Sequence, residues 1–437
     1  MTAEVESRPN TGVVVRDGVY TLAGRLARTV LALVLSVIIA RALGPHDRGL
    51  YALPTAVYTG LVLAVFTGIS TAVAYFMLNH GAGRGILSPA LLTGAVFSAI
   101  GGIPVVAMSV LGHNAWATIP SLLLLPANVP MMIVLGYSLG RKRVRWQTTY
   151  SVLSTAAFLV GTIVAFTLFS RTAYVAVTAF VIMNLVVGAL CLAFVVNDSK
   201  ALQTVPVDPR AFMLFALRVG VVNLVTLLNY RADLYVVAIL TTPAVLGQYA
   251  VAISAAETLL VVTQVAAIVT SPHVGALDRH DAAQLTAKCV RLTFLLALVV
   301  CAAFYAVAPF IVKILYGSAY MPLVPALRIL LIAVMILSLA SPISNFFTLK
   351  LGKPEVPLIS QAFAAVLCVV ASWFLVPRIG MVGAASATAL AYLLGQGIGI
   401  ALFVRATNIS LATLLLPTAN DLYSYIQGGK KLVSSHD

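Results

Sequence analysis

The chain of 437 residues is 61% hydrophobic and only 9% charged, and its mean hydropathy is +1.03. Soluble domains carry about 25% charged residues, so this composition excludes a water-soluble protein and predicts an integral membrane protein. The formal net charge of +14 is typical of membrane proteins, whose cytoplasmic loops concentrate Lys and Arg. We therefore expect no nucleic-acid partner.

Apolar stretches of about 20 residues recur along the chain and predict membrane helices rather than short alternating strands. The polar segment 1–17 precedes an apolar run without a small-residue cleavage site, so we expect this run to remain as a span. The predicted fold is all-α. The twelve predicted spans are 19–41, 50–78, 86–112, 115–139, 146–169, 173–196, 211–240, 245–271, 287–315, 324–349, 356–376 and 380–404.

A repeated motif and a polar connection indicate two similar halves. Pro45–Ala52 and Pro243–Ala250 both read P-x-x-x-G-x-Y-A, and we expect each copy to lie in a short loop between two apolar runs. The hydrophilic connection 197–210 separates six spans from six. We predict two six-helix lobes, related by an axis along the membrane normal, around a central cavity. The predicted parts are an N-terminal lobe (1–200), a linker (201–210), a C-terminal lobe (211–406) and a cytoplasmic tail (407–437).

The distribution of basic residues predicts the orientation. With the N-terminus in the cytoplasm, 17 Lys and Arg residues fall at the cytoplasmic side and six at the outer side, counting those near span ends. The remaining four lie well inside spans. The run Arg141-Lys142-Arg143-Val144-Arg145 is the strongest single indication. This excess predicts that both termini are cytoplasmic.

Sequence signatures of catalysis are absent. The chain has no P-loop, dinucleotide fingerprint or zinc motif, and its four cysteines form no C-x-x-C pair. No connection between spans is long enough for a soluble catalytic domain. We therefore expect no enzyme, no metal site and no cofactor.

Charged residues inside the spans are the candidate functional residues, because each is costly in lipid and usually faces a cavity. In the seventh span, neither the 11 residues from Val219 to Asn229 nor the 7 residues from Leu234 to Leu240 reach the ~20 needed to cross a bilayer. Arg231 and Asp233 must therefore lie within the membrane, unless the helix breaks there. Since they are two positions apart, they do not face each other directly on a helix.

Each of these residues has a functional and a structural interpretation. Arg231, with Arg218, is a candidate for binding an anionic headgroup, because a guanidinium holds phosphate through two hydrogen bonds. Asp233 is a candidate for taking up a proton or cation, or it neutralises Arg231. Glu257 shares a helix face with Gln264, and this polar stripe either lines the cavity or bonds to neighbouring helices.

Arg25 and Arg28 lie three positions apart on one face of the first span. Either both side chains extend to the cytoplasmic interface, or they form a cationic entrance for a pyrophosphate.

Short motifs along nearly the whole chain resemble the Wzx-type polysaccharide flippases of the multidrug/oligosaccharidyl-lipid/polysaccharide (MOP) exporter superfamily. The matching segments are Ala40-Arg41-Ala42-Leu43-Gly44-Pro45 with Gly49-Leu50-Tyr51-Ala52, Asn229-Tyr230-Arg231-Ala232-Asp233, Gly247-Gln248-Tyr249-Ala250 with Ala256-Glu257, Leu315-Tyr316-Gly317 with Tyr320, Leu327-Arg328-Ile329-Leu330, Gly352-Lys353-Pro354 and Gly380-Met381-Val382-Gly383-Ala384-Ala385.

The resemblance implies a multi-pass protein of the bacterial cytoplasmic membrane that flips polyprenyl-pyrophosphate-linked oligosaccharides by alternating access. It implies that Arg25, Arg28, Arg218 and Arg231 bind the substrate, and that Asp233 and Glu257 couple transport to H⁺ or Na⁺. Its implied partners are the lipid-linked glycan, membrane lipids and polysaccharide polymerase or assembly proteins. Lipid II flippases have two further helices, which the twelve predicted spans lack, and this difference argues against lipid II as the substrate.

Three other functions compete with this one. A MATE-type drug or organic cation antiporter shares the fold, but its site should be acidic and aromatic, whereas arginines outnumber acids within these spans by four to two. A membrane glycosyltransferase would need a loop with carboxylates or a metal site. A non-transporting scaffold for glycan assembly would tolerate changes at Arg231 and Asp233.

Overall fold

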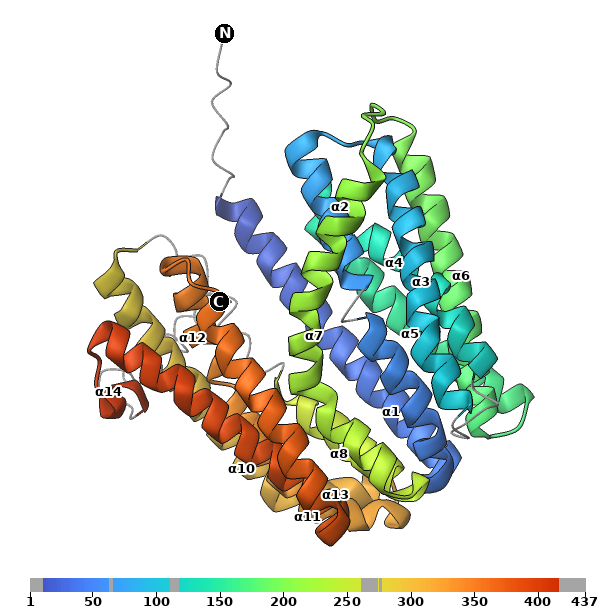
Figure 1. Ribbon diagram of the computed structural model, residues 1–437. Helices are drawn as coiled ribbons and strands as arrows, with labels where there is room; N and C mark the ends of the chain where they lie inside the picture. The colour runs from blue at the N-terminus through green and yellow to red at the C-terminus, as the bar shows by residue number, and fades with distance from the viewer. Residues whose placement is uncertain (1–10, 63–65, 111–117, 261–273, 275–276, 416–437) are drawn as a thin grey trace, which may run out of the picture. The chain divides into compact units, whose positions relative to one another are not determined.

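The computed structural model describes residues 11–62, 66–110, 118–260, 274 and 277–415, and every regular element among them is helical (Figure 1). Nine helical segments of this part of the chain are long and apolar enough to cross a membrane. The all-α membrane fold predicted from composition is therefore confirmed. Residues cluster into two compact units, Met1–Leu227 and Leu228–Asp437.

The first unit is built around one central helix, α4. This helix packs against α2, α3 and α6, and α1 lies alongside α5. At the contact between α2 and α7, Gly68 lies so close to the backbone carbonyl of Ala216 that a Cβ at this position would be 2.1 Å from the oxygen. The helices are α1 (Thr11–Leu61), α2 (Thr67–His80), α3 (Leu87–Val110), α4 (Thr118–Gly140), α5 (Val144–Leu168), α6 (Ala173–Ser199) and the first part of α7 (Pro209–Leu240), with a short 3₁₀ turn at Arg84–Ile86.

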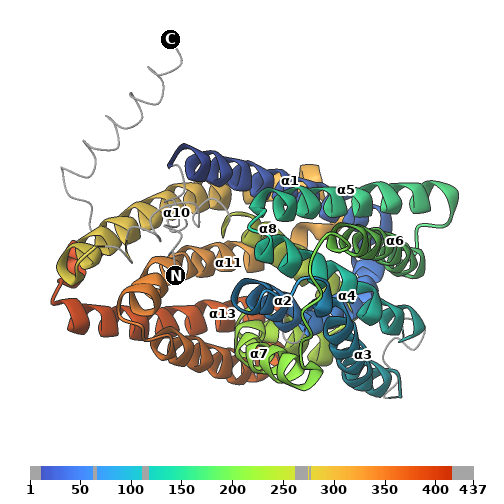
Figure 2. The same ribbon diagram turned by 90° about the horizontal axis from the view of Figure 1, so that it is seen from above.

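The second unit also has a central helix, α11. It packs against α8, α10 and α13, and Figure 2 shows it between α10 and α13. The last part of α7 packs here too, since Ala232 shares a buried cluster with Ala364, Cys368 and Ala391 of α13. The remaining elements are α8 (Pro243–Thr258), α10 (Arg279–Leu315), η4 (Ser318–Leu323), α11 (Val324–Leu337), α12 (Ala340–Asn345), η5 (Phe346–Lys350), α13 (Glu355–Thr407) and α14 (Leu411–Leu415).

Two of the long helices contain a break at a glycine. In α1 the backbone leaves the helical region at Gly44 (φ 70°, ψ 175°), and in α13 it does so at Ile379 and Gly380 (φ 58°, ψ −138°). Glycine adopts these positive φ values without the steric cost that a Cβ brings. The two legs of α13 run antiparallel, because the Ser360 hydroxyl donates to the Gly395 carbonyl and Cys368 lies beside Thr388. These legs correspond to the predicted spans 356–376 and 380–404.

The repeated motif does not lie in loops, and that prediction was wrong. Pro45–Ala52 is helical within α1, and Pro243–Ala250 is helical within α8. Pro243 is the first residue of its helix, where the missing N–H would have no intrahelical partner in any case. Pro243 therefore starts a helix directly after a short bend. The tyrosines of both copies, Tyr51 and Tyr249, are buried.

The predicted linker contains the connection between α6 and α7. Residues 201–208 form no helix, and α7 begins at Pro209. The division between the two compact units falls later, within α7, because the aromatic residues near the start of this helix pack on α2: Phe212 and Phe215 contact Phe76. The predicted lobe boundaries stay a prediction.

Candidate functional site

Arg231 of α7 and Glu257 of α8 form an ion pair with two parallel hydrogen bonds. The Arg231 Nη1–Glu257 Oε1 distance is 2.9 Å, and the Nη2–Oε2 distance is 3.0 Å. Only Thr241 and Thr242 separate α7 from α8, so the two helices are consecutive in the chain. The side chains are 26% and 31% exposed. Neutralisation of Arg231 was one of the two interpretations of Asp233, and in the structure the hydrogen-bonded ion pair of Arg231 is with Glu257.

The Asp233 carboxylate is held by neutral donors instead. Its Oδ1 accepts from the backbone N–H of Leu234 at 2.7 Å, and its Oδ2 accepts from the hydroxyls of Tyr249 at 2.6 Å and Thr388 at 2.7 Å. Asp233 is only 4% exposed. An ionised carboxylate can only accept hydrogen bonds, and these three donors give it partners without an ion pair in the described part of the chain.

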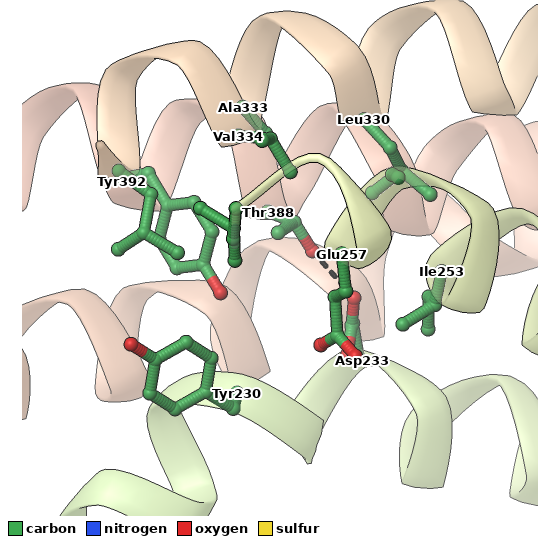
Figure 3. A pocket seen from close by; sticks show the side chains of 12 residues that line it. Tyr230, Asp233, Ile253, Glu257, Leu330, Ala333, Val334, Thr388 and Tyr392 are labelled. Atoms are coloured by element: carbon green, nitrogen blue, oxygen red, sulfur yellow. Dashed lines mark hydrogen bonds between the residues drawn. The ribbon is translucent and has the colours of Figure 1, made fainter. Parts of the chain in front are cut away.

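A small cavity lies beside the two carboxylates (Figure 3). In Figure 3, Tyr230 and Tyr392 lie on one side and Asp233 and Glu257 on the other, and Ala333 and Val334 of α11 lie above them. The cavity has a volume of about 20 Å³, which is enough for about one water molecule or a small cation. It does not hold a sugar or a pyrophosphate in this conformation. The twelve lining residues, all in the second unit, are Tyr230, Asp233, Ile253, Ala256, Glu257, Leu260, Leu330, Ala333, Val334, Leu337, Thr388 and Tyr392.

The other three candidate arginines, Arg25, Arg28 and Arg218, lie in the first unit. All three are exposed, and among the described residues no side-chain hydrogen bond or ion pair joins them to one another. Along α1, Arg28 and Arg25 precede the break at Gly44 by about 24 and 29 Å, at 1.5 Å per residue. If that break lies at one face of a ~30 Å hydrocarbon core, both arginines lie near the opposite face, as the interfacial interpretation expects.

Several residues of this site had no individual signal in the sequence. Tyr249 belongs to the repeated motif, but the repetition does not indicate that its hydroxyl binds a carboxylate. Thr388 and Tyr392 lie in the second leg of α13, more than 150 residues along the chain from their partners in α7. The Thr388 hydroxyl donates to the Asp233 carboxylate, and the Tyr392 hydroxyl donates to the Asn229 carbonyl. Only folding brings them to α7. Gln264, the predicted neighbour of Glu257, lies outside the described residues.

The charged site has no counterpart in the first copy of the repeat. At the 198-residue offset between the motifs, Leu33, Leu35 and Thr59 occupy the positions of Arg231, Asp233 and Glu257. The first unit has a neutral buried cluster instead. Tyr58 donates to Asn184 at 3.1 Å and accepts from Asn128 at 2.5 Å, and all three are buried. Such amide and hydroxyl contacts hold membrane helices together.

Residues 38–325, about two thirds of the chain, match a family described as polysaccharide biosynthesis protein. The chain belongs to this family. A comparison with curated protein sequences gives no match.

Comparison with solved structures shows the fold. The lipid II flippase MurJ in an inward closed conformation matches with a TM-score of 0.70 and 14% identity, over 94% of this chain and 95% of that chain. A multidrug resistance MATE family transporter of the MOP superfamily, in an inward-facing conformation, matches with a TM-score of 0.64 and 16% identity, over 88% of this chain and 96% of that chain. A MOP superfamily transporter from Pyrococcus furiosus, described as having a binding pocket of reverse polarity, matches with a TM-score of 0.62 and 16% identity, over 91% of this chain and 96% of that chain.

The match confirms a polysaccharide biosynthesis family, and the structural comparisons confirm the fold that the resemblance implies. The family supports a role in polysaccharide biosynthesis, and the structural relatives are membrane transporters. Among the described residues, no cluster of three His, Cys, Asp or Glu side chains could hold a metal ion.

Proposed function

We propose that the protein flips polyprenyl-pyrophosphate-linked oligosaccharide repeat units across the bacterial cytoplasmic membrane by alternating access. The family match over residues 38–325 carries this proposal. The MurJ-like fold supports it, because MurJ is itself a flippase for a lipid-linked substrate. The prenyl tail stays in the lipid, while the glycan needs a polar path because its hydroxyls would otherwise lose their hydrogen bonds.

The proposed topology has twelve spans and two cytoplasmic termini. Helices α1 and α13 contain 51 and 53 residues, which at 1.5 Å per residue would extend about 77 and 80 Å. A hydrocarbon core is only about 30 Å thick. The breaks at Gly44 and Gly380 support the division of each helix into two crossings, and the excess of basic residues supports the orientation.

Arg231 is the proposed anchor for the anionic headgroup. It lies nine residues before Leu240 at the end of α7, which is about 14 Å along the helix and therefore near the middle of a ~30 Å core. Arg25, Arg28 and Arg218 are proposed to guide the pyrophosphate from the cytoplasmic face. Asp233 is the proposed coupling carboxylate for H⁺ or Na⁺, since it is buried and has no ionic partner among the described residues.

The decisive experiment follows polyprenyl-linked glycans in the native host after depletion of the protein, and it reports both their amount and their leaflet. We expect a completed repeat unit to accumulate in the cytoplasmic leaflet. Wild-type protein should reverse the accumulation, and well-expressed Arg231→Ala should not. Unchanged lipid-linked glycans, in a host without a redundant flippase, would refute the proposal.

Polymerase or assembly proteins that depend on the flipped unit should be found by crosslinking in the same host.

One observation favours a second candidate, a MATE-type ion-coupled antiporter. Two tyrosines and two carboxylates line the cavity, and acidic aromatic sites suit organic cations. The bond between Glu257 and Arg231 weakens this argument, because it neutralises one of the two acids. Proton- or sodium-driven uptake of ethidium into inverted vesicles would favour the antiporter, and its absence together with glycan accumulation would favour the flippase.

A further inference from the structure

We propose that Glu257 is an internal competitor for Arg231, so that this carboxylate determines which anions the site accepts. The inference rests on the proposed function, in which Arg231 binds an anionic headgroup. It concerns a different property: the binding equilibrium at Arg231 and not the movement of the lipid.

The first argument is geometric. Both Nη atoms of Arg231 already donate to the two oxygens of Glu257, at 2.9 and 3.0 Å. This is the paired geometry with which a guanidinium also holds a phosphate group. A phosphate that binds the Nη end of Arg231 therefore competes with Glu257 for the same two donor atoms, and it can take both of them only when the carboxylate leaves.

The second argument concerns charge. The Arg231–Glu257 pair is neutral as a unit, so at a distance it attracts an anion far less than a free guanidinium does. An anion that carries one charge gains nothing by replacing one carboxylate with another. A pyrophosphate group carries more charge and several oxygens, and it is the kind of ligand that can displace Glu257. Rejection of the weaker competitor is how such a site becomes specific.

The third argument concerns access and release. The side chains of Arg231 and Glu257 are 26% and 31% exposed, whereas Asp233 is 4% exposed. The ion pair is therefore within reach of an anionic ligand, whereas Asp233 meets only the small cavity, which has room for a water molecule or a small cation. Glu257 also lines the cavity of about 20 Å³, which has room for a water molecule to hydrate the carboxylate once it leaves Arg231.

The test measures binding of inorganic pyrophosphate and of acetate to the purified full-length protein in lipid nanodiscs, by calorimetry. Glu257→Gln keeps the shape of the side chain and removes its charge. We expect it to bind pyrophosphate at least 10-fold more tightly than wild type. We also expect it to bind acetate, and we expect wild type not to bind acetate. Arg231→Gln should lose pyrophosphate binding, and the double variant should behave like Arg231→Gln.

The matched control is Glu355→Gln. Glu355 is exposed in the first turn of α13, so this variant makes the same change in net charge away from the site, and its affinity for pyrophosphate should equal that of wild type. If Glu257→Gln does not fold, Glu257→Ala is the second variant, and the same gain in affinity is expected.

Equal or weaker pyrophosphate binding by a folded Glu257 variant overturns the inference. It would show that Glu257 holds Arg231 in place for binding or for folding. The glycan experiment is independent of this result. If depletion causes glycan accumulation but the Glu257 variant binds anions as wild type does, the proposed function stands and the competition is refuted. If the Glu257 variant binds pyrophosphate more tightly but depletion causes no glycan accumulation, the competition stands and the proposed function is refuted.

Discussion

Asp233 and Glu257 are two acids on consecutive helices with different environments. Glu257 is partly exposed and bonded to a guanidinium, while Asp233 is buried and bonded to two hydroxyls and a backbone N–H. This difference assigns them different proposed roles. The sequence placed both inside the membrane but could not distinguish them, because their partners come from other helices.

The hydroxyl of Thr388 should stabilise the fold through Asp233. Thr388→Val keeps the shape of the side chain but removes a buried donor to a carboxylate, and hydrogen bonds to charged groups contribute about 1.5–3 kcal/mol. We therefore expect thermal unfolding of the purified variant at a lower temperature than wild type. Thr388→Ser retains the hydroxyl and should unfold close to wild type. Equal stability of Thr388→Val would show that Asp233 does not depend on this donor.

Asp233→Asn should abolish ion-driven transport, and its effect on the stability of the protein should be smaller. An amide cannot take up a proton or hold a cation as a carboxylate does, while it keeps one oxygen that can accept from Tyr249 or Thr388. The measurement is transport of the lipid-linked glycan in proteoliposomes with and without an ion gradient. Transport that still responds to the gradient in this variant would exclude Asp233 as the coupling group.

At the scale of single helices, the sequence predicted some features well and others not at all. Apolar runs of about 20 residues predicted where helices lie, since a helix satisfies its own backbone hydrogen bonds within lipid. The run from Glu355 to Thr407 was correctly separated near Gly380. The loop predicted at Pro45 and Pro243 was wrong, because proline is compatible both with a turn and with the first residue of a helix.

Packing between helices depends on glycines that the sequence could not rank. Gly68→Ala should destabilise the first unit, because the new Cβ would lie 2.1 Å from the Ala216 carbonyl oxygen and α2 would have to move away from α7. Overpacking of this kind costs about 1–3 kcal/mol. Gly397→Ala is the matched control, since a Cβ at this position would meet no described atom within 4 Å apart from the adjacent backbone of its own helix. Thermal unfolding should separate the two variants, and equal stability would contradict the close contact.

At the scale of the whole molecule, the predicted orientation is directly testable. The four native cysteines are all buried, so labelling of the wild-type chain should be weak. Lys142 lies exposed in the turn between α4 and α5, and Ser318 lies exposed after α10. A membrane-impermeant maleimide added to intact cells should label Ser318→Cys, and it should label Lys142→Cys only in inverted vesicles. The reverse pattern would refute the cytoplasmic termini.

The repeat of the chain carries its charged site only once, since Leu33, Leu35 and Thr59 stand where the second copy has Arg231, Asp233 and Glu257. In the proposed mechanism, coupling through Asp233 alone would exchange one monovalent ion in each transport cycle. That ion supplies about 2.3 kcal/mol for each 100 mV of membrane potential. This energy corresponds to about a 50-fold concentration ratio. The electrical part of the ion's work on each glycan therefore has a fixed ceiling at a given voltage, and any concentration gradient of the ion adds to it. A second charged copy would have doubled that ceiling and the number of ions used per glycan.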